Sequence, residues 1–173
     1  MIILLLADTH DLHDHIRRAF DQARKITTLD AIFHAGDLAA PETFDVLMEA
    51  NLPIHYVIGN NEDDPDLIAE AATRHGIHFY GEQAEFTLGN RQIAMTHYPR
   101  IAESLATFGR YDLILFGHSH NALKRQLTHG GYLVNPGNLA GWREAATFAL
   151  YDTQNHAVQH HVLQTRQTSW SFS

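Results

Sequence analysis

The sequence predicts a single α/β domain in which two packed sheets are flanked by helices. Apolar, strand-like runs alternate with helical patterns over residues 2–76, and short strands dominate the rest of the chain. The 173 residues are 45% hydrophobic and 18% charged, which is the composition of a globular domain with a substantial core. We therefore expect one domain over residues 1–173, with a polar tail at 164–173 that frays.

The first half of the chain predicts alternating strands and helices. Buried strands are expected over residues 2–7, 31–35 and 54–58, because each is a short apolar run. Helices are expected over 13–25, 41–50 and 65–75. The first has Ile16, Ala19 and Phe20 at helical spacing, the second opens with a proline in its first turn, and Gly76 closes the third.

The second half predicts mostly strands. Runs at 77–80, 85–88 and 92–95 read as short strands, and Gly89-Asn90 makes a hairpin turn between the last two. A helix is expected over 102–108 and a buried strand over 112–116. Further strands are expected over 122–127, 132–134, 147–151 and 157–163.

Composition excludes several classes of protein. The chain has no cysteine, which excludes disulfide scaffolds, thiolate zinc sites, Fe–S clusters and cysteine nucleophiles. The longest apolar run, residues 2–7, is far shorter than the ~20 residues that span a bilayer. The net charge of −8 argues against long nucleic acid as a partner. We expect a cytoplasmic protein with no membrane or long nucleic-acid partner.

Polar loops follow six of the predicted strands, and five of these loops carry residues that bind metals in proteins. In open α/β sheets, ligands bind beyond the carboxyl ends of strands. Each motif alone is weak, because the chain has 14 histidines and His-x-His arises by chance. His13-Asp14-His15 is expected to be such a chance match on the surface, and His34 and His55 are expected to be structural. The ordered set of motifs is the informative signal.

That ordered set is Asp8-Thr9-His10, Gly36-Asp37, Gly59-Asn60-Asn61-Glu62, Thr96-His97 and Gly117-His118-Ser119-His120. It resembles the motifs of the calcineurin-like metallophosphoesterase superfamily. The short length and Asn135-Pro136-Gly137 resemble its small bacterial and archaeal phosphodiesterase branch. The resemblance implies a four-layer α-β-β-α sandwich of two packed mixed sheets with a two-metal centre. It implies that Asp8, His10 and His120 bind the first metal, that Asn60, His97 and His118 bind the second, and that Asp37 bridges both.

The residue types agree with that chemistry. Oxygen and imidazole ligands suit Mn, which we expect, and also Ni, Zn, Fe or Mg. Two divalent ions bring four positive charges, and Asp8, Asp37 and a bridging hydroxide together remove three. The remaining charge of about +1 can hold a phosphate ester even in an acidic protein. The hydroxide shared by the metals would attack phosphorus in line with the leaving group.

The chain departs from the family pattern at the usual proton donor. The common motif reads Gly-Asn-His-Asp/Glu, and here Asn61 replaces the histidine and is followed by Glu62. An amide cannot deliver a proton at neutral pH, and loss of a general acid typically costs about 10²–10⁴-fold in rate. We expect Asn61 and Glu62 to occupy the catalytic positions and good leaving groups to be favoured. Tyr98 is expected to line the pocket and stack on a base or aryl ester, and Arg143 to contact phosphate.

The leading hypothesis is a phosphodiesterase acting on a small phosphate ester, with nucleotides among the candidates. A phosphomonoesterase using the same site is one alternative. A second is a non-catalytic scaffold of the same fold, and the presence of all seven ligand positions argues against it. A third is a histidine-rich metal buffer, which predicts scattered binding that does not depend on Asp37. A homo-oligomer is compatible with the resemblance, and no sequence feature decides it.

Overall fold

The computed structural model describes residues 1–62 and 64–164, and its strands form two sheets. The first sheet has the strand order β11-β10-β1-β2-β3-β4, spanning Ala157–Val162, Thr147–Asp152, Ile2–Leu6, Ala31–His34, Ile54–Tyr56 and His78–Phe79. The second has the order β5-β6-β7-β9-β8, spanning Gln83–Leu88, Arg91–Thr96, Leu113–Leu115, Tyr132–Asn135 and Leu123–Gln126. Both sheets are mixed: β1–β4 are parallel, as are β6, β7 and β9, and the other strands pair antiparallel.

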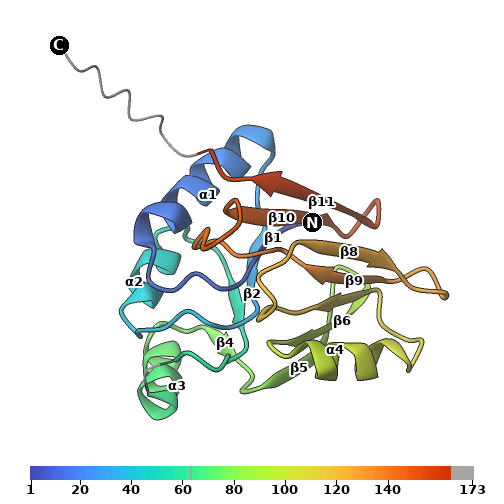
Figure 1. The fold of residues 1–173 in the computed structure, drawn as a ribbon, viewed down its shortest axis with the longest axis horizontal. Helices are drawn as coiled ribbons and strands as arrows, with labels where there is room; N and C mark the ends of the chain where they lie inside the picture. The colour runs from blue at the N-terminus through green and yellow to red at the C-terminus, as the bar shows by residue number, and fades with distance from the viewer. Residues whose placement is uncertain (63, 165–173) are drawn as a thin grey trace.

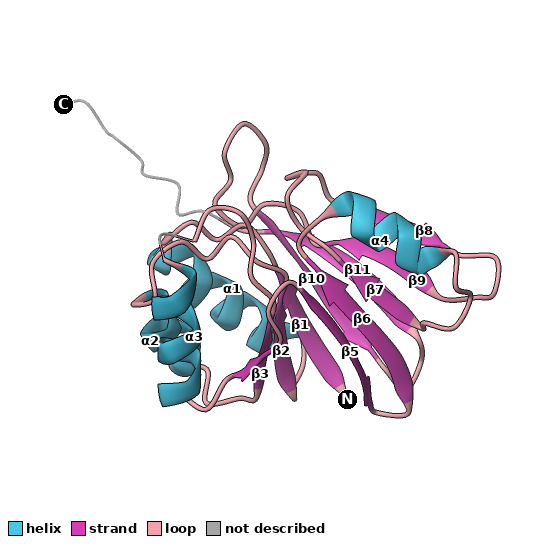
Figure 2. Cartoon of the chain, turned by 90° about the horizontal axis from the view of Figure 1, so that it is seen from below, coloured by secondary structure: helices cyan, strands magenta, loops and turns pink. Residues whose placement is uncertain are grey.

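Alternate residues of each strand face different layers, as the period of two requires. Ile3 and Leu5 of β1 pack in the core between the sheets, whereas Leu4 and Leu6 face the helices α1 (His13–Ile26), α2 (Thr43–Met48) and α3 (Pro65–Arg74). Helix α4 (Pro99–Ala106) covers the outer face of the second sheet. Figures 1 and 2 show the three helices on one side of the sheets and α4 on the other. The predicted four-layer α-β-β-α sandwich is confirmed.

Local signals explain most element boundaries. Asp64 caps α3 by accepting from the backbone N–H groups of Asp66 and Leu67, with Pro65 in the first turn. Gly89 and Asn90 both have positive φ (56° and 60°), as a tight hairpin turn between β5 and β6 requires. No helix within the described residues is long and apolar enough to cross a membrane. The predicted fraying of 164–173 lies outside the described residues, apart from Gln164.

Two helices differ from the prediction. Helix α2 begins at Thr43 rather than Pro41. Residues 40–45 instead form tight turns, because their backbone hydrogen bonds join residues three apart, for example Phe44 N–H to the Pro41 carbonyl. Helix α4 begins at Pro99 rather than residue 102, because the proline occupies the first helical position, where no N–H is needed. Tyr98, which directly follows His97 in the chain, is the N-cap residue of α4.

Candidate metal centre

The seven predicted ligands follow five strands, at the carboxyl end of each. Asp8 and His10 follow β1, Asp37 follows β2 and Asn60 follows β3. In the second sheet His97 follows β6, and His118 and His120 follow β7. Backbone hydrogen bonds join neighbouring loops, such as those from Thr9 and His10 to the Asp37 carbonyl at 2.9 and 3.1 Å. The two packed sheets thereby bring all seven residues to one end of the molecule.

Backbone strain concentrates at these residues. Among the described residues, eleven non-glycine residues have positive φ, and five of them are predicted ligands: Asp8, His10, Asp37, His118 and His120. Such conformations cost about 1–3 kcal/mol each, and they persist where the surrounding structure imposes them, which is often at functional sites. Four of these five side chains, all except that of His118, converge on a common point.

The first cluster consists of Asp8, His10, Asp37 and His120, and one ligand atom of each lies within 4.8 Å of the others. His120 Nε2 is 3.3 Å from Asp8 Oδ1, and His10 Nε2 is 3.8 Å from Asp37 Oδ2. Asp8 Oδ2 and His10 Nε2 are buried and have no hydrogen-bond partner. A buried polar atom without a partner is costly, so this arrangement suits a cation that both atoms can bind.

The second cluster consists of Asn60 and His97, which contact the other oxygen of Asp37, and of His118, which contacts Asn60. The fully buried His97 donates from Nδ1 to the Ala35 carbonyl at 2.8 Å, so in the neutral ring Nε2 carries a lone pair. That lone pair faces Asp37 Oδ1 at 3.3 Å and Asn60 Oδ1 at 3.1 Å. His118 Nδ1 lies 2.6 Å from the same amide oxygen. With His97 neutral, its Nε2, Asp37 Oδ1 and Asn60 Oδ1 are all electron-pair donors, and a cation placed among them would offset their mutual repulsion.

The pKa values fit a site prepared for cations. Burial, together with the neighbouring Asp37 carboxylate, raises the pKa of Asp8 to about 8. Burial lowers the pKa of His10, His97 and His120, which favours the neutral imidazole that binds metals. Burial works to raise the pKa of Asp37, but the interaction with the neighbouring His97 ring and hydrogen bonds from Asn61 and Asn60 lower that pKa overall. The oxygen and imidazole donors and the unpartnered atoms together fit divalent metal ions.

Asn61 and Glu62 support this centre rather than face the open pocket. The Asn61 amide donates to Asp37 Oδ2 at 2.6 Å, and its backbone N–H donates to Asp37 Oδ1 at 2.9 Å. Glu62 accepts from the Tyr56 hydroxyl and from the backbone N–H groups of Gly59 (3.0 Å) and Leu38 (3.2 Å). Its carboxylate thus joins the loop that carries Asp37 to the loop that carries Asn60. These contacts favour positioning roles for both residues.

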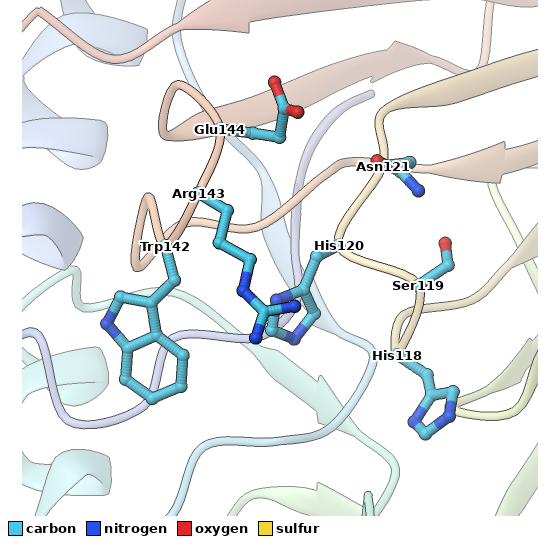
Figure 3. Close-up of a pocket in the computed structure, with 7 residues that line it drawn as sticks. All are labelled: His118, Ser119, His120, Asn121, Trp142, Arg143 and Glu144. Carbon is cyan, nitrogen blue, oxygen red and sulfur yellow. The ribbon is translucent and has the colours of Figure 1, made fainter.

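The predicted substrate-binding residues, Tyr98 and Arg143, both lie beside predicted metal ligands. Tyr98 packs edge-on against His97, with ring centroids 5.3 Å apart. Arg143 lines a pocket of about 440 Å³ together with His118 and His120, and Figure 3 shows its side chain reaching into that pocket. The structure therefore brings both residues to the cluster of predicted ligands.

Sequence reasoning missed Trp142 and Asn138. The Trp142 ring stacks on His10 with centroids 4.2 Å apart, and Asn138 Nδ2 lies 3.1 Å from His120 Nδ1. An aromatic residue in the polar loop that follows Asn-Pro-Gly was the only available signal for Trp142.

Two histidines that lie outside the site, His13 and His15, make hydrogen bonds of their own. His13 contacts the Thr43 hydroxyl, and His15 contacts the Leu139 carbonyl. Both are partly buried, so the expected surface pair has structural contacts.

His34 and His55 contribute to packing and hydrogen bonding within strands. His34 is fully buried and lies 3.0 Å from the Thr9 hydroxyl. His55 lies 2.7 Å from the Tyr80 hydroxyl and stacks on Phe86. Burial lowers the pKa of His34 to about 3 and that of His55 to about 4, so both rings are neutral near pH 7. These contacts agree with the structural roles expected for the two residues.

Comparison with known proteins identifies the family. Residues 1–156 match the model of the calcineurin-like phosphoesterase superfamily domain. The chain belongs to the calcineurin-like phosphoesterase superfamily. The matched range includes all seven predicted ligands, so the order of motifs that suggested this superfamily was an adequate guide.

Relatives within and beyond the archaea share the fold. Phosphodiesterase MJ0936 of Methanocaldococcus jannaschii is 22% identical, covering 95% of this chain and 100% of the relative. The structure of an archaeal phosphodiesterase has a TM-score of 0.85 at 22% identity, covering 94% of this chain and 100% of that one. The structure of Vps29 from Entamoeba histolytica, complexed with Zn²⁺, has a TM-score of 0.64 at 16% identity, covering 93% of this chain and 97% of that one. The structural likenesses establish the shared superfamily fold.

Proposed function

We propose that this chain is a cytoplasmic, metal-dependent phosphodiesterase that acts on a small phosphate ester at a centre for two divalent ions, with Mn²⁺ as the expected metal. The proposal is carried by the cluster of Asp8, His10, Asp37 and His120, in which two buried atoms have no partner, and by His97 and Asn60, which contact the same Asp37 carboxylate. Asp8, His10 and His120 would hold one ion, Asn60, His97 and His118 the other, and Asp37 both. Bound ions would supply Lewis-acid chemistry, which activates a shared water as hydroxide and neutralises charge on the phosphoryl oxygens.

The chain's own residues orient this centre. The amide and backbone N–H of Asn61 and the backbone N–H of Asn60 hold both oxygens of Asp37 through three hydrogen bonds of 2.6–2.9 Å. The Ala35 carbonyl fixes the tautomer and ring orientation of His97, as outer hydrogen bonds do for metal-binding histidines. Such fixed geometry is what catalysis by positioned charge requires.

The diester preference rests on Asn61. Its amide donates to Asp37 and cannot supply a proton to a leaving group at neutral pH. Good leaving groups depart without that proton, and a diester carries a single negative charge that a centre of modest positive charge can hold. Arg143 would contact a phosphoryl oxygen, and Tyr98 would contact the ester group beside the second ion.

The experiment compares hydrolysis of bis-p-nitrophenyl phosphate with that of p-nitrophenyl phosphate, after chelation and with Mn²⁺ added back. We expect diester turnover that is restored by Mn²⁺ and exceeds monoester turnover. Asp37→Ala should abolish it and lower the bound metal, whereas Asp21→Ala, which changes an exposed aspartate on α1, serves as the matched control. Full diester activity in Asp37→Ala would contradict the site assignment.

Other outcomes identify the alternatives. Preference for the monoester would indicate a phosphatase with another proton donor. Stoichiometric metal without turnover on either ester would favour a scaffold protein of the same fold. Metal binding that is unchanged in Asp37→Ala would indicate a histidine-rich metal buffer, because its sites would be scattered over other histidines.

A further inference from the structure

Trp142 presents an aromatic surface beside the first cluster. Trp142 is 50% exposed. One face of its ring nevertheless stacks on His10, with ring centroids 4.2 Å apart and an interplanar angle of 22°. The same ring lies 6.3 Å from that of His120. Tryptophan offers a large apolar surface with few rotatable bonds, so the part not covered by His10 is available to stack with a ligand.

The loop holds Trp142 in a defined position. Asn138 donates from Nδ2 to the Trp142 carbonyl at 3.2 Å, and its Oδ1 accepts from Gly141 N–H at 3.1 Å. The Ala140 N–H donates to the Asp8 carbonyl at 3.1 Å. The segment that carries the tryptophan is therefore attached to the loop that carries two predicted ligands, which lowers the entropy cost of stacking a ligand on it.

Tyr98 offers a second aromatic surface beside the other cluster. Its ring lies 5.3 Å from His97 and 6.0 Å from His118. Trp142 thus packs on histidines of the first cluster and Tyr98 on histidines of the second. Asp37 contacts one histidine of each cluster, with Oδ2 3.8 Å from His10 Nε2 and Oδ1 3.3 Å from His97 Nε2. A phosphorus atom bound at Asp37 would therefore lie next to the two histidines, His10 and His97, against which the aromatic rings pack.

The space beside Trp142 suits a nucleoside-sized group. The pocket there is about 440 Å³, within the range of small-ligand sites, and Figure 3 shows its wall formed by residues 118–121 on one side and 142–144 on the other. Arg143 in this wall supplies positive charge near the centre. The pocket therefore combines an aromatic surface with a group that attracts phosphate.

We propose that Trp142 and Tyr98 stack separately on the two ester groups of the substrate, so that the preferred substrates are phosphodiesters with an aromatic ring on each side of the phosphorus. A dinucleoside monophosphate is the nucleic-acid member of this class. This inference rests on the proposed function and extends it to the substrate. In hydrolysis, water adds to phosphorus, one P–O ester bond breaks, and the released alcohol or phenol carries away one of the two rings.

The test measures KM and kcat for bis-p-nitrophenyl phosphate with Mn²⁺ in Trp142→Ala, Tyr98→Ala and the double variant. Each single variant should raise KM about tenfold, since stacking on an aromatic side chain contributes about 1–3 kcal/mol, which is a factor of about 5–150 in affinity. The double variant should raise KM about 100-fold, because separate contacts are additive. Trp142→Phe should restore most of the loss, because it keeps a ring.

Phe108→Ala is the matched control, because Phe108 is 58% exposed and lies beyond the far end of α4. A KM within twofold of wild type in Trp142→Ala would overturn the inference, as would a fall in kcat at unchanged KM, which would mean that Trp142 acts through His10. A double variant no worse than the singles would place both rings on one ester group and also overturn it. If the wild type hydrolyses no diester, the proposed function is wrong and the inference falls with it.

Discussion

Gly59 keeps the space in which the Asp37 carboxylate sits. A Cβ atom at residue 59 would lie 2.2 Å from Asp37 Oδ1 and 2.5 Å from its backbone nitrogen. Gly59 is not in the left-handed region, so Gly59→Ala tests this contact without backbone strain. Restoring an ordinary separation requires a displacement of about 1 Å, and part of it must come from the backbone of Asp37.

The expected cost of Gly59→Ala is specific to the site. Overpacking of this kind costs about 1–3 kcal/mol of folding free energy. A misplacement of about 1 Å at a catalytic centre costs on the order of 100-fold in rate. The control is Gly109→Ala: Gly109 has a φ of +66° and open space around its Cβ position, so alanine costs about 1–2 kcal/mol through backbone strain alone. The two variants should lose similar stability, and only Gly59→Ala should lose activity.

Three measurements check this reasoning: urea unfolding, bound metal by elemental analysis, and kcat/KM for bis-p-nitrophenyl phosphate with Mn²⁺. We expect Gly59→Ala to remain folded at 25 °C while it loses about 100-fold in kcat/KM and binds less metal. More than half of the wild-type activity in Gly59→Ala would refute the argument. An equal loss in Gly109→Ala would show that reduced stability, rather than the position of Asp37, lowers the rate.

Three further predictions concern the proton donor, acid stability and metal removal. Asn61→His should raise turnover of monoesters with poor leaving groups more than that of aryl diesters, and equal changes in both would show that residue 61 is not in the acid position. Burial lowers the pKa of His55 from its ordinary value of 6.5 to about 4 in the folded protein. Between these two pH values the unfolded chain binds a proton at His55 that the folded chain does not, so the free energy of unfolding falls as the pH decreases from 6.5 to 4. In metal-free protein, urea unfolding should show that His55→Phe removes on the order of 2 kcal/mol from the pH dependence of stability between pH 7.5 and 4.5. An unchanged dependence would exclude His55 as its source. With free Mn²⁺ at a concentration 100-fold above its Kd, chelation of the metal should lower the Tm of the wild type by about 5–10 °C. An equal fall in the Tm of Asp37→Ala would place the metal elsewhere.

Much of the fold was predictable because its signals are local. The apolar run that became β1, the capping sequence of α3 and the Gly89-Asn90 turn each depend on residues close together in the chain. The boundaries of α2 and α4 were less predictable, because a proline allows either a first helical turn or a tight turn before the helix. Which one forms depends on the hydrogen bonds available in the folded loop.

The sequence by itself determined the residues that can bind metal and their order at the ends of strands. It also predicted the loss of the usual proton donor, because Asn61 stands where the resemblance places a histidine. Only the tertiary structure decided where these side chains point: the lone pair of His97 toward Asn60, the Asn61 amide onto Asp37, and Trp142 over His10. These contacts join loops that are far apart in the chain and have strained backbones, and hydrophobic periodicity carries no information about such loops.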